Sequence, residues 1–76
     1  MESLYDVQEW LKKYAYINLF PNRKEAIYFM KLEMTELRKR GIITENDPNF
    51  LTASLILRRE LKIENSKLNI GRSIND

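Results

Sequence analysis

The sequence predicts an all-α protein, a small three-helix bundle followed by a flexible C-terminal tail. Three segments place apolar residues at helical spacing, and they span about residues 4–16, 23–40 and 48–63. Residues that suit the ends of helices separate these segments. Because the chain has 76 residues, we expect one domain, residues 1–63, and a polar tail, residues 64–76, that is frayed or disordered.

The first helix is expected to begin after Ser3, whose hydroxyl can accept the free N–H groups of the first turn. Its core stripe is predicted to consist of Leu4, Val7, Leu11, Tyr14 and Ala15. Its outer side is predicted to carry Tyr5, Lys12 and Tyr16. In the connector that follows, Phe20 is expected to pack over the start of the second helix, or alternatively to face a partner together with Leu19.

The second helix is the longest periodic segment, with an N-cap at Asn22 and a stop at Gly41, which can adopt the left-handed conformation. Its apolar stripe consists of Ala26, Ile27, Met30, Met34 and Leu37. Its charges are sorted into two flanks on a helical wheel. The cations Lys24, Lys31, Arg38 and Lys39 lie near Tyr28 and Leu32, and the glutamates Glu25, Glu33 and Glu36 lie near Phe29. This sorting fits a binding surface or, alternatively, an ordinary solvated face.

The third helix is expected to start with Asp47 as N-cap and Pro48 as its first residue. Its inner face is predicted to consist of Phe50, Ala53, Ile56, Leu57 and Leu61, and its outer side to carry Leu51, Leu55, Arg58 and Lys62. Glu60 falls within the apolar stripe. Since an unpaired buried carboxylate is costly, we expect Glu60 to pair with the Tyr14 hydroxyl or with an arginine of the second helix.

The composition argues against several classes of function. The chain has no cysteine and no histidine, so it lacks disulfides, thiolate metal ligands and the commonest general base. It also lacks a glycine-rich phosphate loop. We therefore expect no enzymatic activity, no catalytic residues, no cofactor and no metal site. The sequence shows neither a signal peptide nor an apolar run of membrane-spanning length, so we expect a cytoplasmic protein without a membrane partner.

Several short motifs resemble the YqgQ-like family of small uncharacterised cytoplasmic proteins from low-GC Gram-positive bacteria. The resemblance opens with Tyr5-Asp6-Val7-Gln8, Leu11-Lys12 and Tyr14, and continues with Asn22-Arg23, Met30, Glu33 and Glu36-Leu37. It closes with Ile43, Phe50, Ala53 and the run Leu55-Ile56-Leu57-Arg58-Arg59-Glu60, and so spans about residues 5–60. The resemblance implies a three-helix bundle that binds single-stranded nucleic acid, with basic positions at Arg23, Arg58 and Arg59.

The chain departs from the family pattern in three places. Family members have a glycine after the Tyr14 position, where this chain has Ala15. Their connector ends in Tyr-x-Gly, where this chain has Leu19-Phe20-Pro21. The acidic segment that follows their arginine is replaced by Glu25-Ala26-Ile27-Tyr28-Phe29.

Together these observations predict a non-catalytic binding protein whose ligand is single-stranded RNA or DNA. The residues expected to neutralise phosphates or stack on bases are Arg23, Lys24, Tyr28, Lys31, Arg58, Arg59 and Lys62. Tyr5 and Tyr16 are further candidates for stacking. The alternative is a small protein-protein interaction module or a homo-oligomeric adaptor, which would use the surface residues Phe29, Leu32, Leu51 and Leu55.

Overall fold

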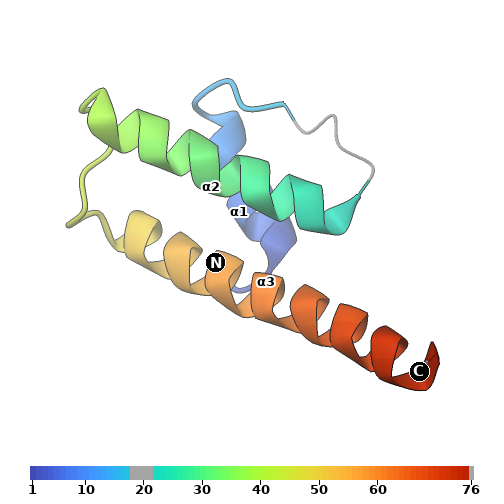
Figure 1. Ribbon diagram of the computed structural model, residues 1–76. Helices are drawn as coiled ribbons and strands as arrows, with labels where there is room; N and C mark the ends of the chain where they lie inside the picture. The colour runs from blue at the N-terminus through green and yellow to red at the C-terminus, as the bar shows by residue number, and fades with distance from the viewer. Residues whose placement is uncertain (18–21, 76) are drawn as a thin grey trace.

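Three α-helices make up the fold, in the order α1 (Leu4–Lys12), α2 (Arg23–Lys39) and α3 (Pro48–Asn75) (Figure 1). The structure, a computed structural model, describes the backbone of residues 1–17 and 22–75 and the side chains of 1–17 and 22–67. Within these ranges there is no β-strand, which confirms the predicted all-α, three-helix architecture. The expected packing of Phe20 falls outside the described residues.

Helix α1 begins as predicted and ends four residues earlier than predicted. Ser3 and Asp6 form a reciprocal capping box at its start. Its end is set by Ala15, whose φ of 67° lies in the left-handed region. The N–H of Ala15 donates to the Lys12 carbonyl at 3.0 Å, and the N–H of Tyr16 donates to the Leu11 carbonyl at 3.3 Å. These two bonds are the Schellman arrangement that closes a helix.

This early turn changes the environment of two side chains. Ala15, predicted to be in the core, is exposed. Tyr16, predicted to be on the outer side, folds back onto the bundle and is only 8% exposed. Burial, together with the nearby Glu33 carboxylate, raises the pKa of Tyr16. The prediction that Tyr16 offers an exposed ring for stacking is therefore wrong.

Helix α2 has ends close to the predicted ones because both are fixed by local chemistry. The Asn22 side chain accepts the N–H groups of Lys24 at 2.8 Å and Glu25 at 3.2 Å. At the other end Gly41 has φ 74°, and the N–H of Ile42 donates to the Leu37 carbonyl at 2.9 Å. A glycine tolerates this left-handed conformation without steric cost.

Helix α3 starts as predicted and is longer than predicted. The Asp47 carboxylate accepts the N–H of Asn49 at 2.8 Å, and Pro48 is the first helical residue. The predicted end near residue 63 is wrong, since the helix continues to Asn75. Beyond Pro48 the chain has no proline, and Gly71 within a helix costs only about 1 kcal/mol relative to alanine. Fraying of residues 64–76 in solution stays a prediction.

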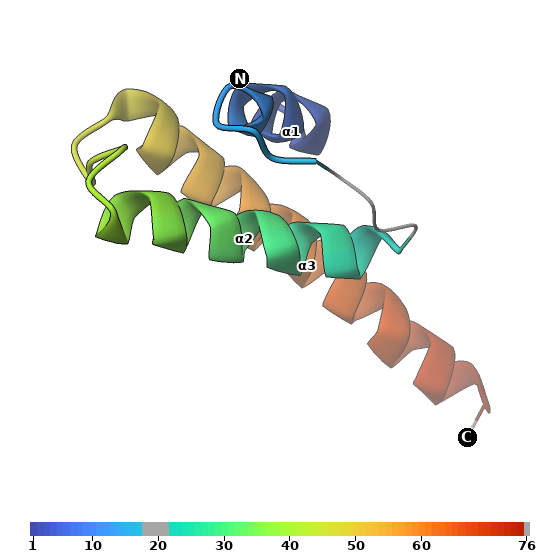
Figure 2. The same ribbon diagram turned by 90° about the horizontal axis from the view of Figure 1, so that it is seen from above.

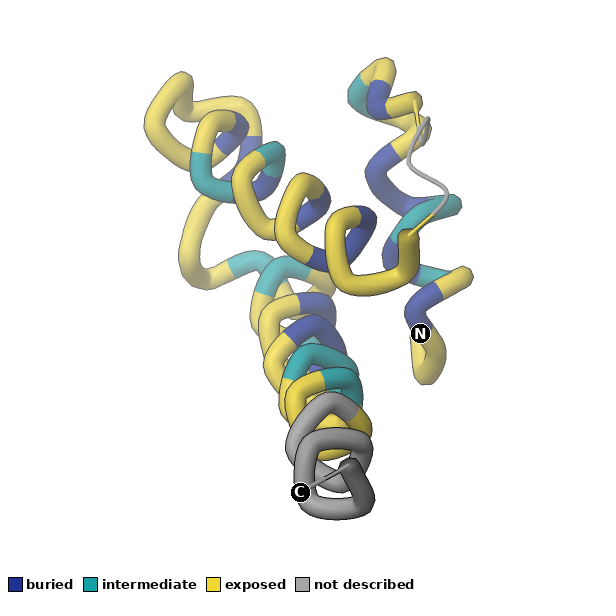
Figure 3. The backbone as a smooth tube through the Cα atoms, turned by 45° about the vertical axis from the view of Figure 1, so that its right-hand side comes forward, coloured by how far each residue is buried: buried dark blue, intermediate teal, exposed yellow. Residues whose placement is uncertain are grey.

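The core lies where the three helices meet. Helices α2 and α3 run antiparallel, and α1 packs against both of them (Figures 1 and 2). Figure 3 shows that buried positions lie on the sides of the helices that face one another, and exposed positions face outward. The largest fully buried side chains are Leu11, Ile27, Met30, Leu37 and Val7, all from the predicted apolar stripes. The far part of α3 extends beyond α1 and α2 (Figure 2).

Glu60 confirms the expectation that it pairs with an arginine of the second helix. Its side chain is 13% exposed and lies 3.2 Å from the guanidinium of Arg23. The same guanidinium lies 3.1 Å from Glu64, one turn further along α3. Arg23 therefore joins the start of α2 to two successive turns of α3.

Candidate nucleic-acid interface

One side of α2 carries a row of basic and polar side chains. Lys24, Tyr28, Lys31, Thr35 and Arg38 follow one another at intervals of three or four residues, so they share one helical stripe. The apolar stripe that contains Met30 and Met34 is buried beside them. The basic row therefore borders the core, on the side of α2 that faces the edge of α3.

Helix α3 contributes a matching row. Phe50, Ser54, Leu57, Leu61 and Asn65 are spaced by three or four residues and line the same groove. Arg58 and Lys62 lie beside them on the outward side. Because α2 and α3 are antiparallel, the start of one row lies opposite the end of the other.

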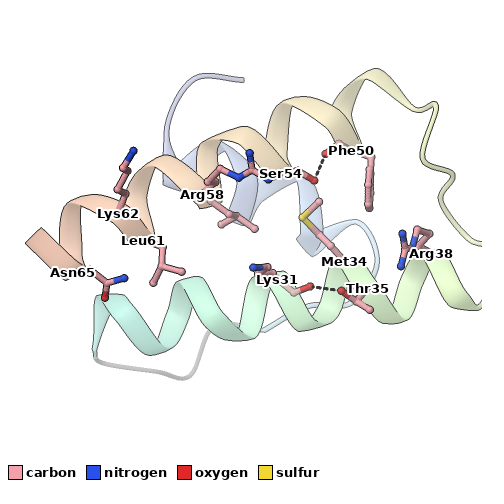
Figure 4. Close-up of a pocket in the computed structure, with 11 residues that line it drawn as sticks. Lys31, Met34, Thr35, Arg38, Phe50, Ser54, Arg58, Leu61, Lys62 and Asn65 are labelled. Atoms are coloured by element: carbon pink, nitrogen blue, oxygen red, sulfur yellow. Dashed lines mark hydrogen bonds between the residues drawn. The ribbon is translucent and has the colours of Figure 1, made fainter.

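The two rows enclose a groove of about 450 Å³ (Figure 4). Met34 and Leu57 are buried in its floor, and Phe50 and Leu61 are half-buried. Four cations line it, namely Lys31, Arg38, Arg58 and Lys62. No carboxylate is among the lining residues. The groove thus combines an apolar floor with walls of a single sign of charge.

Figure 4 shows how these side chains are arranged. Lys31 on α2 and Arg58 on α3 both lie near the middle of the groove, and Arg38 lies near one end. Lys62 projects from the side of α3 that faces away from α2. The cations therefore extend from the interior of the groove over its outer rim.

Most of these cations are available to a ligand. Arg38 donates to Glu45 at 3.0 Å, and both side chains are exposed to solvent, so a phosphate can replace the carboxylate at little cost. Within residues 1–17 and 22–67, no carboxylate lies within ion-pair distance of Lys31, Arg58 or Lys62. Their charges are therefore not neutralised by the described side chains.

The structure divides the seven residues predicted from the sequence into two groups. Lys31, Arg58 and Lys62 line the groove, and Lys24 and Tyr28 lie on the same helical stripe of α2 as Lys31, toward its start. The Tyr28 ring is 56% exposed and packs edge-on against Phe29, with centroids 5.4 Å apart. These five residues therefore line the groove or lie on the basic stripe of α2 that borders it.

Arg23 and Arg59 belong to neither the groove nor this stripe. Arg23 is held by the Glu60 and Glu64 carboxylates. Arg59 donates to the backbone carbonyl of Glu2 at 2.8 Å and lies 3.5 Å from Glu60, which ties α3 to the N-terminal segment. The guanidinium groups of both arginines therefore bind groups of the protein itself, and they hold helices and the N-terminal segment together.

Sequence reasoning missed Arg38, Phe50 and Asn65 as groove residues. Arg38 lies on the basic flank of the helical wheel with Lys31, which was a usable signal. Phe50 and Asn65 required the antiparallel register of α2 against α3, which no local pattern contains. Tyr5, the other stacking candidate, is 64% exposed on α1 and does not line the groove.

Other kinds of site find no support in the described part of the chain. No three carboxylates there gather closely enough to hold a metal ion. None of the described helices has the length and apolar character needed to cross a bilayer.

A family model described as YqgQ-like matches residues 1–63, which covers α1, α2 and the part of α3 that lines the groove up to Lys62. No curated protein and no solved structure matches the chain.

Proposed function

The chain belongs to the YqgQ-like family, and we propose that it is a non-catalytic, cytoplasmic protein that binds single-stranded nucleic acid in the groove between α2 and α3. The observation that carries this proposal is the groove itself, with four cations and no carboxylate around an apolar floor. The cations can neutralise the phosphates of a bound strand, and its bases can stack on the Tyr28 ring or contact the apolar floor. The absence of histidine and cysteine from the sequence supports a non-catalytic role.

The floor favours a single strand over a duplex. Base faces can contact Phe50, Leu61 or Tyr28 only when they are not stacked within a helix, and each stacked base contributes about 1–3 kcal/mol. The net charge of +2 is small for a protein that binds duplexes through their backbone alone. We therefore expect sequence-tolerant binding with a preference for single strands.

Salt dependence follows from the number of cations. If Lys31, Arg38, Arg58 and Lys62 each neutralise one phosphate, the log–log slope of affinity against salt is about −3 for a single strand. Affinity should then fall about 50-fold when salt rises from about 50 to about 200 mM.

Arg58 and Arg59 provide a matched pair of variants for the test. They are adjacent on α3, and Arg58 lines the groove, whereas Arg59 donates to the Glu2 carbonyl. In a mobility-shift assay with single- and double-stranded probes, we expect Arg58→Ala to weaken binding of the single strand several-fold and Arg59→Ala to leave it nearly unchanged. Equal binding of both probe types, or equal effects of the two substitutions, would contradict the proposal.

A second function, self-association, is favoured by a different observation. Large apolar side chains are exposed on the outer sides of α2 and α3, among them Leu32 at 42%, Leu51 at 53% and Leu55 at 65%. These surfaces differ from the floor of the groove.

A further inference from the structure

The outward side of α3 presents apolar and basic residues together. Leu51, Leu55, Arg58 and Lys62, here named the basic face, follow one another at intervals of four, three and four residues, so they form one stripe. Leu55 is 65% exposed and Leu51 53%. Glu60 is the single acidic residue between 48 and 63, and it is turned inward to pair with Arg23. The basic face therefore contains no negative charge.

The outward side of α2 has the same spacing with the opposite charge. Glu25, Phe29, Leu32 and Glu36, here named the acidic face, also follow one another at intervals of four, three and four residues. Leu32 is 42% exposed and Phe29 36%, and both glutamates are exposed. Glu36 lies 3.8 Å from the amine of Lys39. Because this ion pair is long and exposed, Glu36 can leave Lys39 for another cation at little cost.

The two faces match when one helix is laid antiparallel on the other. Glu25 then lies opposite Lys62, Phe29 opposite Arg58, and Leu32 opposite Leu55, which gives an ion pair, a cation–π contact and an apolar contact. Both faces lie on the outer sides of their helices, away from the buried stripes. They cannot meet within one copy of the chain, because α2 and α3 pack through their inner sides.

We propose that the acidic face of one copy binds the basic face of a second copy. The contact is heterologous, since the two surfaces differ, and each copy keeps one face free for a further copy. The interface is small, so we expect a dissociation constant of about 0.1–1 mM. The proposal does not require nucleic acid to bind, although the basic face shares Arg58 and Lys62 with the groove.

Two substitutions block one face each. Leu32→Lys places a cation in the acidic face, where it meets the basic face of the next copy. Leu55→Glu places a carboxylate in the basic face, where it meets the acidic face. Ile17→Lys is the control, because Ile17 is 68% exposed and lies on neither face. Circular dichroism checks that all three variants remain helical.

The test is the weight-average mass of the full chain by sedimentation equilibrium between about 0.02 and about 2 mM, a range that brackets the expected constant. Wild type and Ile17→Lys should rise above the monomer mass of 9.1 kDa as concentration increases. Leu32→Lys and Leu55→Glu should each stay at the monomer mass. An equimolar mixture of the two should associate again, because each supplies the intact face that the other lacks.

Three results would overturn the proposal. A wild-type chain that stays monomeric throughout would show that the two faces do not bind each other. Association of Leu32→Lys at the wild-type level would show that the acidic face takes no part. A mixture that fails to recover association would exclude pairing of two different faces.

Discussion

Replacing Ala15 by glycine should stabilise the protein. The Ala15 backbone has φ 67°, a conformation that costs an L-residue about 1–2 kcal/mol and glycine almost nothing. The gain is partly offset because glycine makes the unfolded chain more flexible, by about 0.4–1 kcal/mol. The Ala15 side chain is exposed, so its removal loses no core packing. We expect a net increase of about 0.5–1 kcal/mol in the free energy of unfolding, or about 2–8 °C in Tm.

Gly41→Ala is the opposite experiment on the second helix. Gly41 has φ 74°, and a Cβ added there meets nothing within 4 Å, so only the backbone conformation opposes the substitution. We expect a loss of about 0.5–1 kcal/mol. Both variants are compared with wild type by urea unfolding followed by far-UV circular dichroism. If Ala15→Gly destabilises the protein, as glycine does within an ordinary helix, the assignment of a left-handed turn at Ala15 is refuted.

Two further predictions concern the helix ends. The backbone N–H groups of Glu2 and Ser3 donate to the Asp6 carboxylate and lower its pKa, with Glu2 having the larger effect. The capping contribution of Asp6 to stability is therefore present above the unfolded pKa of about 3.9, and it is lost as pH falls through the lower folded pKa. The difference in unfolding free energy between wild type and Asp6→Asn should therefore shrink below about pH 4, and a difference that grows with acidity would contradict this account. Arg23→Ala should lower the free energy of unfolding, measured with urea, by about 1 kcal/mol, because it leaves the mostly buried Glu60 without its partner on α2. The control Lys24→Ala should change that free energy by less than about 0.5 kcal/mol.

Local chemistry made part of the fold predictable. Ser3, Asn22, Asp47 and Gly41 each mark a helix end through bonds made within a few residues, and all four occupy the positions expected from the sequence. The apolar stripes likewise identified most of the core. By contrast, the end of α1 was missed because alanine strongly favours helix, so nothing in the local sequence marks a left-handed turn at Ala15.

The candidate site was predictable only in part, because a groove depends on the register between two helices. The positive charge of Lys31 and Arg58 was evident, and their position across one groove follows from the antiparallel packing of α2 and α3. Arg23 and Arg59 have the same chemistry in the sequence, yet the structure directs them to Glu60 and to a backbone carbonyl. The difference between a groove arginine and a structural one is set by tertiary contacts.

The salt dependence of oligonucleotide binding tests the central claim most directly. Fluorescence anisotropy of a labelled single-stranded oligonucleotide is titrated at several salt concentrations with wild type, Lys31→Ala/Arg58→Ala and Lys12→Ala/Lys13→Ala. Both double variants remove the same charge, the first from the groove and the second from the end of α1. We predict that the groove variant reduces the log–log slope by about 1.4, corresponding to two phosphate contacts, and that the α1 variant leaves it unchanged. Equal slopes for the two variants would contradict binding in the groove.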